Sequence, residues 1–205
     1  VKPLIQSLDT FRNSYIPKLS FYVISHERSG THFLINSINS NLNVRVGYGI
    51  GKGSGRGYNN IGENFGPYDS KNDGCEHINH YNLKLWHKGV SKNAIIKSHA
   101  TTSLYKKNYK KAPVVYIYRN PIDCLASWYK YLNNATYYNN NPLVQDMRCI
   151  NPSEFLRRPC NSFLNNCYSD NIKFNNVVER WINHVSGWTK ETNICLVKYS
   201  ELKAD

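Results

Sequence analysis

The sequence is poor in acidic residues and has no long apolar segment. Its 205 residues include 14 Asp and Glu against 26 Lys and Arg, which gives a formal net charge of +12. An excess of that size favours a polyanionic partner: a nucleic acid, an acidic membrane surface or an anionic small molecule. No run of about 18 apolar residues occurs, so no membrane-spanning helix is expected. The first twenty residues are too polar for a secretion signal, so we expect a cytoplasmic protein.

Cysteine pairs of the zinc-binding type are also absent. None of the six cysteines forms a C-x-x-C pair, so no metal site is expected. Cys124 and Cys195 lie in apolar segments, where we expect buried thiols. Cys149, Cys160 and Cys167 share one loop-rich stretch, which leaves a disulfide and reduced thiols as alternatives. Without a secretion signal, reduced thiols are favoured.

Short apolar segments alternate with helical patterns along the chain. The apolar segments are 21–25, 93–99, 112–119 and 193–200. Apolar residues at helical spacing begin at Thr31, at Pro121 and at Phe174. Strands that are apolar nearly throughout and alternate with helices predict an α/β fold, in which a central parallel sheet carries helices on both faces. Ligands of such sheets bind at the carboxyl ends of the strands.

One domain spanning 1–205 accounts for this pattern, with loop-rich insertions at 47–74 and 133–171. The first insertion contains the glycine-rich stretch "GYGIGKGSGRG". It matches neither the Walker loop nor the dinucleotide fingerprint, because its glycines alternate and no helical pattern follows. We therefore expect a surface loop. The alternative is a lid in which Lys52 and Arg56 contact an anionic substrate.

The stretch "FYVISHERSGTHFLINSI" predicts a strand, a tight turn and a helix. The amides from Ser29 to His32 would then lie at the helix start, where they have no partner inside the helix and attract anions. Gly30 permits close approach, Thr31 adds a hydroxyl donor, and Arg28 adds a fixed charge able to bridge two oxygens. The alternative is an ordinary turn in which Ser29 caps the helix.

A second anion site is predicted in "YIYRNPIDCLASWY". Arg119 ends a strand, and Ser127 lies eight residues later, about two helical turns on. Both could reach a phosphate, although an ion pair between Arg119 and Asp123 is the simpler interpretation.

A candidate base lies in "IIKSHA". Lys97 and His99 are two residues apart at a strand end, hence on the same side of that strand. A histidine in that position suits proton transfer at neutral pH, although a structural histidine is the alternative.

Together these motifs resemble the sulfotransferases that use 3′-phosphoadenosine 5′-phosphosulfate (PAPS). "ERSGTHFL", "IIKSHAT" and "VYIYRNPIDCLASWY" resemble the 5′-phosphosulfate loop, the catalytic-histidine segment and the 3′-phosphate segment, in the family's order. "RWINHVSGW" and "CLVKYSELK" resemble the helix and strand that follow. The resemblance implies a P-loop-type three-layer α/β/α fold. It also implies metal-independent transfer of a sulfuryl group to a hydroxyl or amine of a small-molecule or carbohydrate acceptor, with adenosine 3′,5′-bisphosphate (PAP) as the other product.

Site roles follow from the same resemblance. His99 would deprotonate the acceptor, Arg28 would stabilise charge on the leaving oxygen, and Lys97 would steady the sulfuryl oxygens. The residues expected to bind the cofactor are Arg28, Ser29, Gly30, Thr31 and His32 at the 5′-phosphate, Arg119 and Ser127 at the 3′-phosphate, and Tyr199 near the adenine.

The chain also departs from the family pattern. Arg28 replaces a usual lysine, and His32 a usual threonine or serine. The family's later basic segment over the 3′-phosphate has no counterpart in this sequence. Three explanations stay open: the chain is truncated, its loops replace that segment, or the 3′-phosphate is bound weakly. Two other functions stay open, a P-loop small-molecule kinase and a non-catalytic nucleic-acid-binding protein. The first lacks a strand-end Asp for magnesium, and the second lacks an RNA-binding signature, so nucleic acid is not the expected partner.

Overall fold

The computed structural model describes residues 21–42, 59–60, 95–108, 113–134, 142–148, 151–161 and 173–203. Its strands are β1 (Phe21–Ser25), β2 (Asn59–Asn60), β3 (Ile95–Ser98), β4 (Val114–Tyr118) and β5 (Cys195–Lys198). They form one sheet in the order β2-β3-β1-β4-β5, and each pairing between neighbours is parallel. The expected parallel sheet is therefore confirmed.

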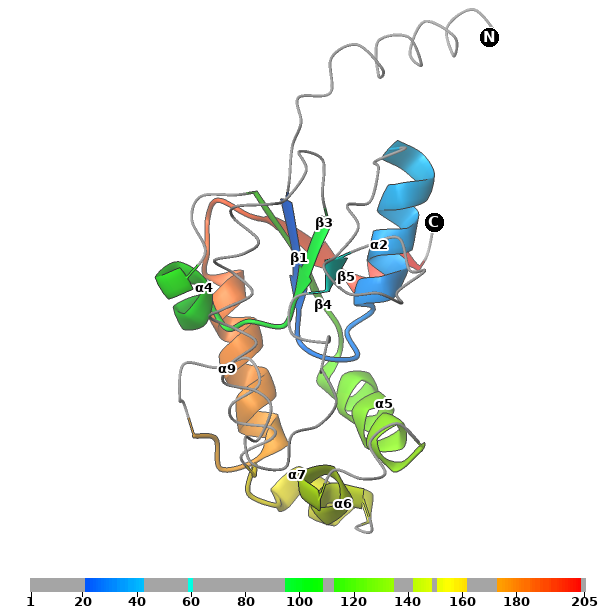
Figure 1. Ribbon diagram of the computed structural model, residues 1–205, viewed down its shortest axis with the longest axis vertical. Helices are drawn as coiled ribbons and strands as arrows, with labels where there is room; N and C mark the ends of the chain where they lie inside the picture. Colours follow the sequence, from blue (N-terminus) through cyan, green and yellow to red (C-terminus); the bar gives the residue numbers. More distant parts are fainter. Residues whose placement is uncertain are drawn as a thin grey trace, which may run out of the picture.

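Helices cover both faces of this sheet (Figure 1). They are α2 (Thr31–Leu42), α4 (Thr102–Asn108), α5 (Pro121–Asn134), α6 (Pro142–Arg148), α7 (Pro152–Arg157), α9 (Val177–Thr189) and α10 (Tyr199–Leu202). α2 lies on one side of the strands, and α4 and α9 lie on the other. The expected three-layer α/β/α architecture is confirmed. None of the helices in these described ranges is long and apolar enough to cross a membrane.

Alternating side chains of β1 build the two halves of the core. Val23 packs with Leu34 of α2, whereas Tyr22 and Ile24 pack with Trp188 of α9. All five side chains are almost completely buried, and burying each one stabilises the fold by about 1.5–3 kcal/mol. This two-sided burial explains why the segment is apolar throughout rather than alternating.

A third apolar cluster lies beyond the carboxyl ends of the strands. It joins α5, α6, α7 and the start of α9, which Figure 1 shows below the sheet. Its largest buried members are Trp128, Phe155 and Phe174. The short helices expected within 133–171 are thus present, and Pro142 and Pro152 each occupy a first helical position, where a missing N–H costs nothing.

Several boundaries differ from the sequence-based expectation. A short strand, β2, lies inside the segment expected to be only a surface loop, and the rest of 47–74 is outside the described residues. The strand expected over 193–200 ends at Lys198, because Tyr199 begins α10. Helix α4 was not predicted. Asn120 caps α5 as expected, accepting a hydrogen bond from the Ile122 amide at 2.9 Å.

The cysteine predictions have mixed outcomes. Cys124 is a buried thiol as expected, but Cys195 is exposed on β5, so its assignment to the core was wrong. Cys160 is a buried thiol, and burial raises its pKa to about 11. Cys149 and Cys167 lie outside the described residues.

Candidate active site

The turn between β1 and α2 has the geometry of an anion-binding loop. Arg28 and Gly30 both adopt positive φ, at 63° and 98°. The Ser29 amide donates to the His26 carbonyl at 3.3 Å, and the first helical bond runs from the Leu34 amide to the Gly30 carbonyl at 3.0 Å. Gly30, not Ser29, therefore holds the N-cap position, and the capping role considered for Ser29 was wrong. The amides at the start of α2 face the end of the sheet, where a helix attracts anions.

Hydroxyl groups tie this turn together. Ser25 Oγ and Thr31 Oγ1 are 2.5 Å apart, and both residues are buried. The hydroxyl of Ser29 contacts Cys124 Sγ at 3.6 Å. His32 is half-buried on the first turn of α2. The predicted 5′ side therefore forms one continuous polar turn.

Tyr199 packs directly on Gly30. A Cβ atom added at Gly30 would lie 2.3 Å and 2.5 Å from two ring carbons of Tyr199. The guanidinium carbon of Arg119 lies over the same Tyr199 ring, 4.6 Å from its centre. The ring thus connects the turn to Arg119, the arginine predicted to bind the 3′-phosphate.

Arg119 keeps hydrogen-bonding capacity within this site. Its Nε is buried and, among the described residues, makes no hydrogen bond. The ion pair considered above exists only as a long contact, 3.8 Å from Nη2 to Asp123 Oδ2, and that carboxylate is 62% exposed. A buried donor without a partner is costly, so this nitrogen suits an oxygen of a bound anion.

Arg28 lies along α5 rather than over its own turn. Its Nε donates to Ser127 Oγ at 3.3 Å, and its guanidinium lies 4.5 Å from the centre of the Tyr131 ring. Two residues predicted to serve opposite ends of the cofactor, Arg28 and Ser127, are therefore in direct contact.

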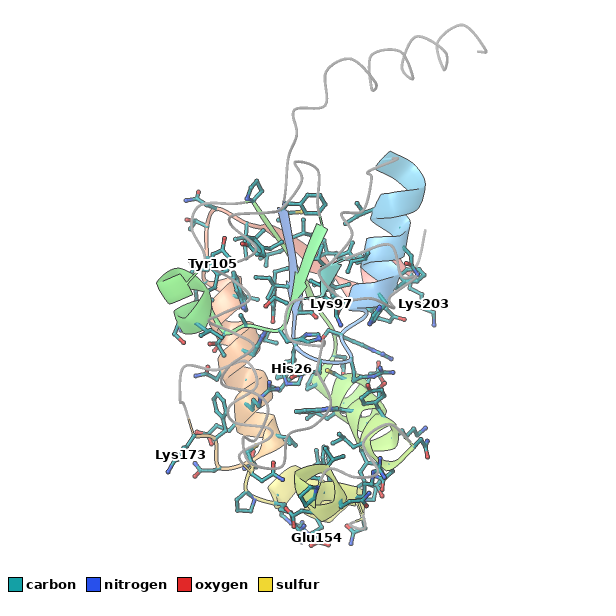
Figure 2. The ribbon with its side chains drawn as sticks, viewed as in Figure 1. His26, Lys97, Tyr105, Glu154, Lys173 and Lys203 are labelled. Carbon is teal, nitrogen blue, oxygen red and sulfur yellow. The ribbon has the colours of Figure 1, made fainter. Side chains whose placement is uncertain are left out.

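The candidate base is held from one side. His99 is buried, and its Nδ1 lies 2.7 Å from the Ser25 carbonyl and 3.3 Å from Ser25 Oγ. Because a carbonyl oxygen only accepts, Nδ1 carries the hydrogen, and Nε2 is the basic nitrogen of the neutral ring. Lys97 is buried on β3, where it pairs in register with Val23 and so shares the face covered by α2. Figure 2 shows Lys97 near the start of α2.

Residues 18–205 match the sulfotransferase domain family. The chain belongs to this family. Among solved structures, a mouse sulfotransferase, SULT7A1, complexed with PAP matches with a TM-score of 0.53 and 17% identity, covering 97% of this chain and 57% of the mouse chain. A retinol dehydratase in complex with retinol and PAP matches with a TM-score of 0.46, 17% identity, and coverage of 99% and 61%. A comparison with curated proteins finds no match. The chain thus has the sulfotransferase fold and spans little more than half the length of the solved structures it matches.

Behind the turn between β1 and α2 lies a buried ion pair that the sequence pattern did not reveal. Arg180 of α9 donates from Nη1 to Glu27 Oε2 at 2.6 Å and from Nη2 to Glu27 Oε1 at 2.7 Å. Its Nη1 also lies 3.1 Å from His26 Nε2. Burial alone would raise the pKa of Glu27, but the Arg180 guanidinium outweighs it and holds that pKa well below its usual range. Glu27 is therefore a carboxylate at neutral pH.

Two neighbouring groups stay uncharged. Burial lowers the pKa of His26 to about 4, and the nearby Arg180 charge acts in the same direction. Figure 2 shows His26 just past the end of β1, between α9 and α5. Burial raises the pKa of Cys124 to about 11, so its thiol stays protonated and donates to the Glu27 carbonyl at 3.0 Å.

One face of α9 carries polar contacts both to the turn after β1 and to the segment after β3. Arg180, His184 and Trp188 are spaced four residues apart and therefore line one side of the helix. His184 Nε2 donates to the His99 carbonyl at 3.1 Å, and Trp188 Nε1 donates to the Ala100 carbonyl at 2.9 Å. In the sequence, the signal for these contacts is the four-residue spacing of side chains that can donate hydrogen bonds. The apolar pattern of the same helix made this spacing hard to recognise.

Proposed function

We propose that the protein is a PAPS-dependent sulfotransferase that transfers a sulfuryl group to a hydroxyl or amine of a small-molecule or carbohydrate acceptor. The observation that carries the proposal is the buried Arg119 Nε without a partner in the described residues, joined through Tyr199 to the anion turn at Gly30. Family membership supports the proposal. The mouse sulfotransferase structure that the chain matches is a complex with PAP.

The described residues fit an adenosine carrying phosphates at both ends. The amides from Gly30 to His32 would bind the 5′-phosphate at the start of α2, where the missing side chain of Gly30 leaves room for the Tyr199 ring. The Ser29 amide is already engaged by the His26 carbonyl. Arg119, with its unmatched Nε, and Ser127 would bind the 3′-phosphate. Tyr199 would contact the adenine side through the ring that already supports Arg119.

The cofactor, when bound, supplies a sulfuryl group on a phosphosulfate linkage. His99 takes the acceptor proton at Nε2, because Nδ1 is engaged by the Ser25 carbonyl. Lys97 and Arg28 provide fixed positive charge for the oxygens on which negative charge develops. Arg28 acts only by its charge, since arginine does not release its proton. Because burial lowers the pKa of His26 to about 4, this ring is a poor base, and the Glu27 carboxylate behind the turn is paired with Arg180.

The test is transfer of label from donor to acceptor. The purified chain, in its longest expressible form, is incubated with PAPS labelled at sulfur and a panel of phenols, alcohols, amines and sugars. The expected result is labelled acceptor in the presence of a metal chelator, with loss of transfer in the variant His99→Ala.

Two outcomes would overturn the proposal. Transfer of phosphorus label from ATP that stops with the chelator would show a kinase. Binding of single-stranded nucleic acid that collapses with salt, without competition by PAP, would show a nucleic-acid-binding protein.

A further inference from the structure

Glu27 presents an electrostatic difficulty for an anion-binding turn. It lies one residue before Arg28, inside the segment that receives the 5′-phosphate in the proposed function. An unpaired carboxylate at that position would repel the ligand. The guanidinium of Arg180 removes this repulsion by binding both carboxylate oxygens, and only 2% of the Arg180 side chain is exposed.

The same contact fixes the backbone of the turn. Arg28 has φ 63°, a left-handed conformation that is costly for a residue other than glycine and persists only where the surroundings hold it. Glu27, the residue before Arg28, is held by two contacts. Arg180 binds its carboxylate, and the Cys124 thiol donates to its backbone carbonyl. Releasing the carboxylate removes the support that α9 gives to the left-handed turn.

Arg180 also connects the turn to the base. Four residues further along α9, His184 holds the carbonyl of His99, and the guanidinium of Arg180 itself lies 5.1 Å from the centre of the Trp128 ring of α5. The position of Arg180 on this helix therefore relates the anion turn to the segment that carries the candidate base.

We propose that Arg180 is a positioning residue for the 5′-phosphate: by binding both oxygens of Glu27 it neutralises that carboxylate and holds the Arg28–Gly30 turn in its anion-binding conformation. The inference rests on the proposed function, because the ligand of the turn is the 5′-phosphate of the cofactor. It assigns to Arg180 no contact with the ligand.

The test compares two nucleotides that differ only at the 5′ position. Adenosine 3′,5′-bisphosphate uses both anion sites, and adenosine 3′-monophosphate uses only the Arg119 side. The main variant is the double substitution Glu27→Gln with Arg180→Met, which removes both charges and avoids leaving a lone buried ion. Affinities are measured by calorimetry on the full chain, and circular dichroism establishes that each variant is folded.

We expect the double variant to lose about 10- to 100-fold in affinity for the bisphosphate, because small misplacement of binding groups is costly. Its affinity for the 3′-monophosphate should stay within about twofold of the wild type. The matched control is Arg158→Met. This substitution also removes an arginine that forms ion pairs, here with the carboxylates of Asp146 and Glu154. That control should leave both affinities unchanged, since Arg158 follows α7, which lies at the far end of α9 from the sheet (Figure 1).

The outcomes separate this inference from the proposed function. A double variant that binds the bisphosphate as the wild type does, or that loses both nucleotides equally, overturns the positioning role alone. A wild-type chain that binds neither nucleotide overturns the proposed function and this inference with it. If the double variant does not fold, Arg180→Lys decides the question. A lysine keeps the charge but cannot bridge both oxygens, so a selective loss of bisphosphate affinity is still expected, and an unchanged ratio of the two affinities overturns the role.

Discussion

Replacing Gly30 by alanine tests whether the contact between the turn and Tyr199 shapes the site. The new methyl group would lie 2.3 Å and 2.5 Å from ring carbons of Tyr199, well inside van der Waals contact. Overpacking of this kind costs about 1–3 kcal/mol, because the ring must move. The φ of 98° adds backbone strain of about 1–3 kcal/mol for a residue with a Cβ atom. We therefore expect Gly30→Ala to lower the free energy of unfolding by about 2–6 kcal/mol.

A second substitution separates the two terms. In a Tyr199→Ala background the ring is absent, so Gly30→Ala should cost only the backbone strain, about 1–3 kcal/mol. The matched control is Gly187→Ala within α9, where the added Cβ would lie 2.7 Å from Thr102 Oγ1 and 3.5 Å from Thr102 Cγ2. Alanine is favoured over glycine in a helix by about 1 kcal/mol, which offsets that contact, so stability should change little.

The assay is urea unfolding of all four variants and the wild type, together with bisphosphate binding. Because the displaced ring supports Arg119, Gly30→Ala should also weaken bisphosphate binding, whereas Gly187→Ala should not. An equal cost of Gly30→Ala with and without the Tyr199 ring would refute the steric reasoning. A cost below about 1 kcal/mol in both backgrounds would refute the strain reasoning as well.

Three further predictions concern the base, the second anion site and pH. His99→Ala should abolish turnover and leave bisphosphate affinity nearly intact, since the proposed base acts on the acceptor and not on the cofactor; a large loss of affinity, measured by calorimetry, would contradict that role. Arg119→Ala should weaken PAP far more than adenosine 5′-phosphosulfate, which lacks the 3′-phosphate, and equal weakening would argue against a 3′-phosphate contact. The folded pKa of His26 is about 4 against 6.5 for an ordinary histidine, so the unfolded chain gains a proton first as the pH falls. This histidine's contribution is complete above pH 6.5 and is lost toward pH 4, with about 2 kcal/mol disappearing between pH 7 and pH 5. Urea unfolding at both pH values should show a smaller difference for His26→Gln than for the wild type, and identical differences would be incompatible with a buried neutral histidine.

Much of the framework could be predicted because its signals are local. The apolar run at 21–25 is buried on both faces, and a strand between two helical layers has no solvent side to mark with polar residues. Asn120 and Pro121 predict the start of α5, because an N-cap hydrogen bond and a proline at the first helical position involve only neighbouring residues. The strand of 193–200 was overextended because Tyr199 and its neighbours suit a strand locally, while packing on α2 makes them a helix.

The sequence by itself therefore determined the order of the strands and helices apart from β2, α4 and α10, the glycine in the anion turn and the chemical types gathered at the strand ends. Only the tertiary structure decided which distant groups meet there. Arg180 and Glu27 are 153 residues apart, and no periodicity relates them. Tyr199 reaches Gly30 only because β5 lies beside β4 in the sheet. Such contacts arise from the packing of whole elements, so a local pattern carries no record of them.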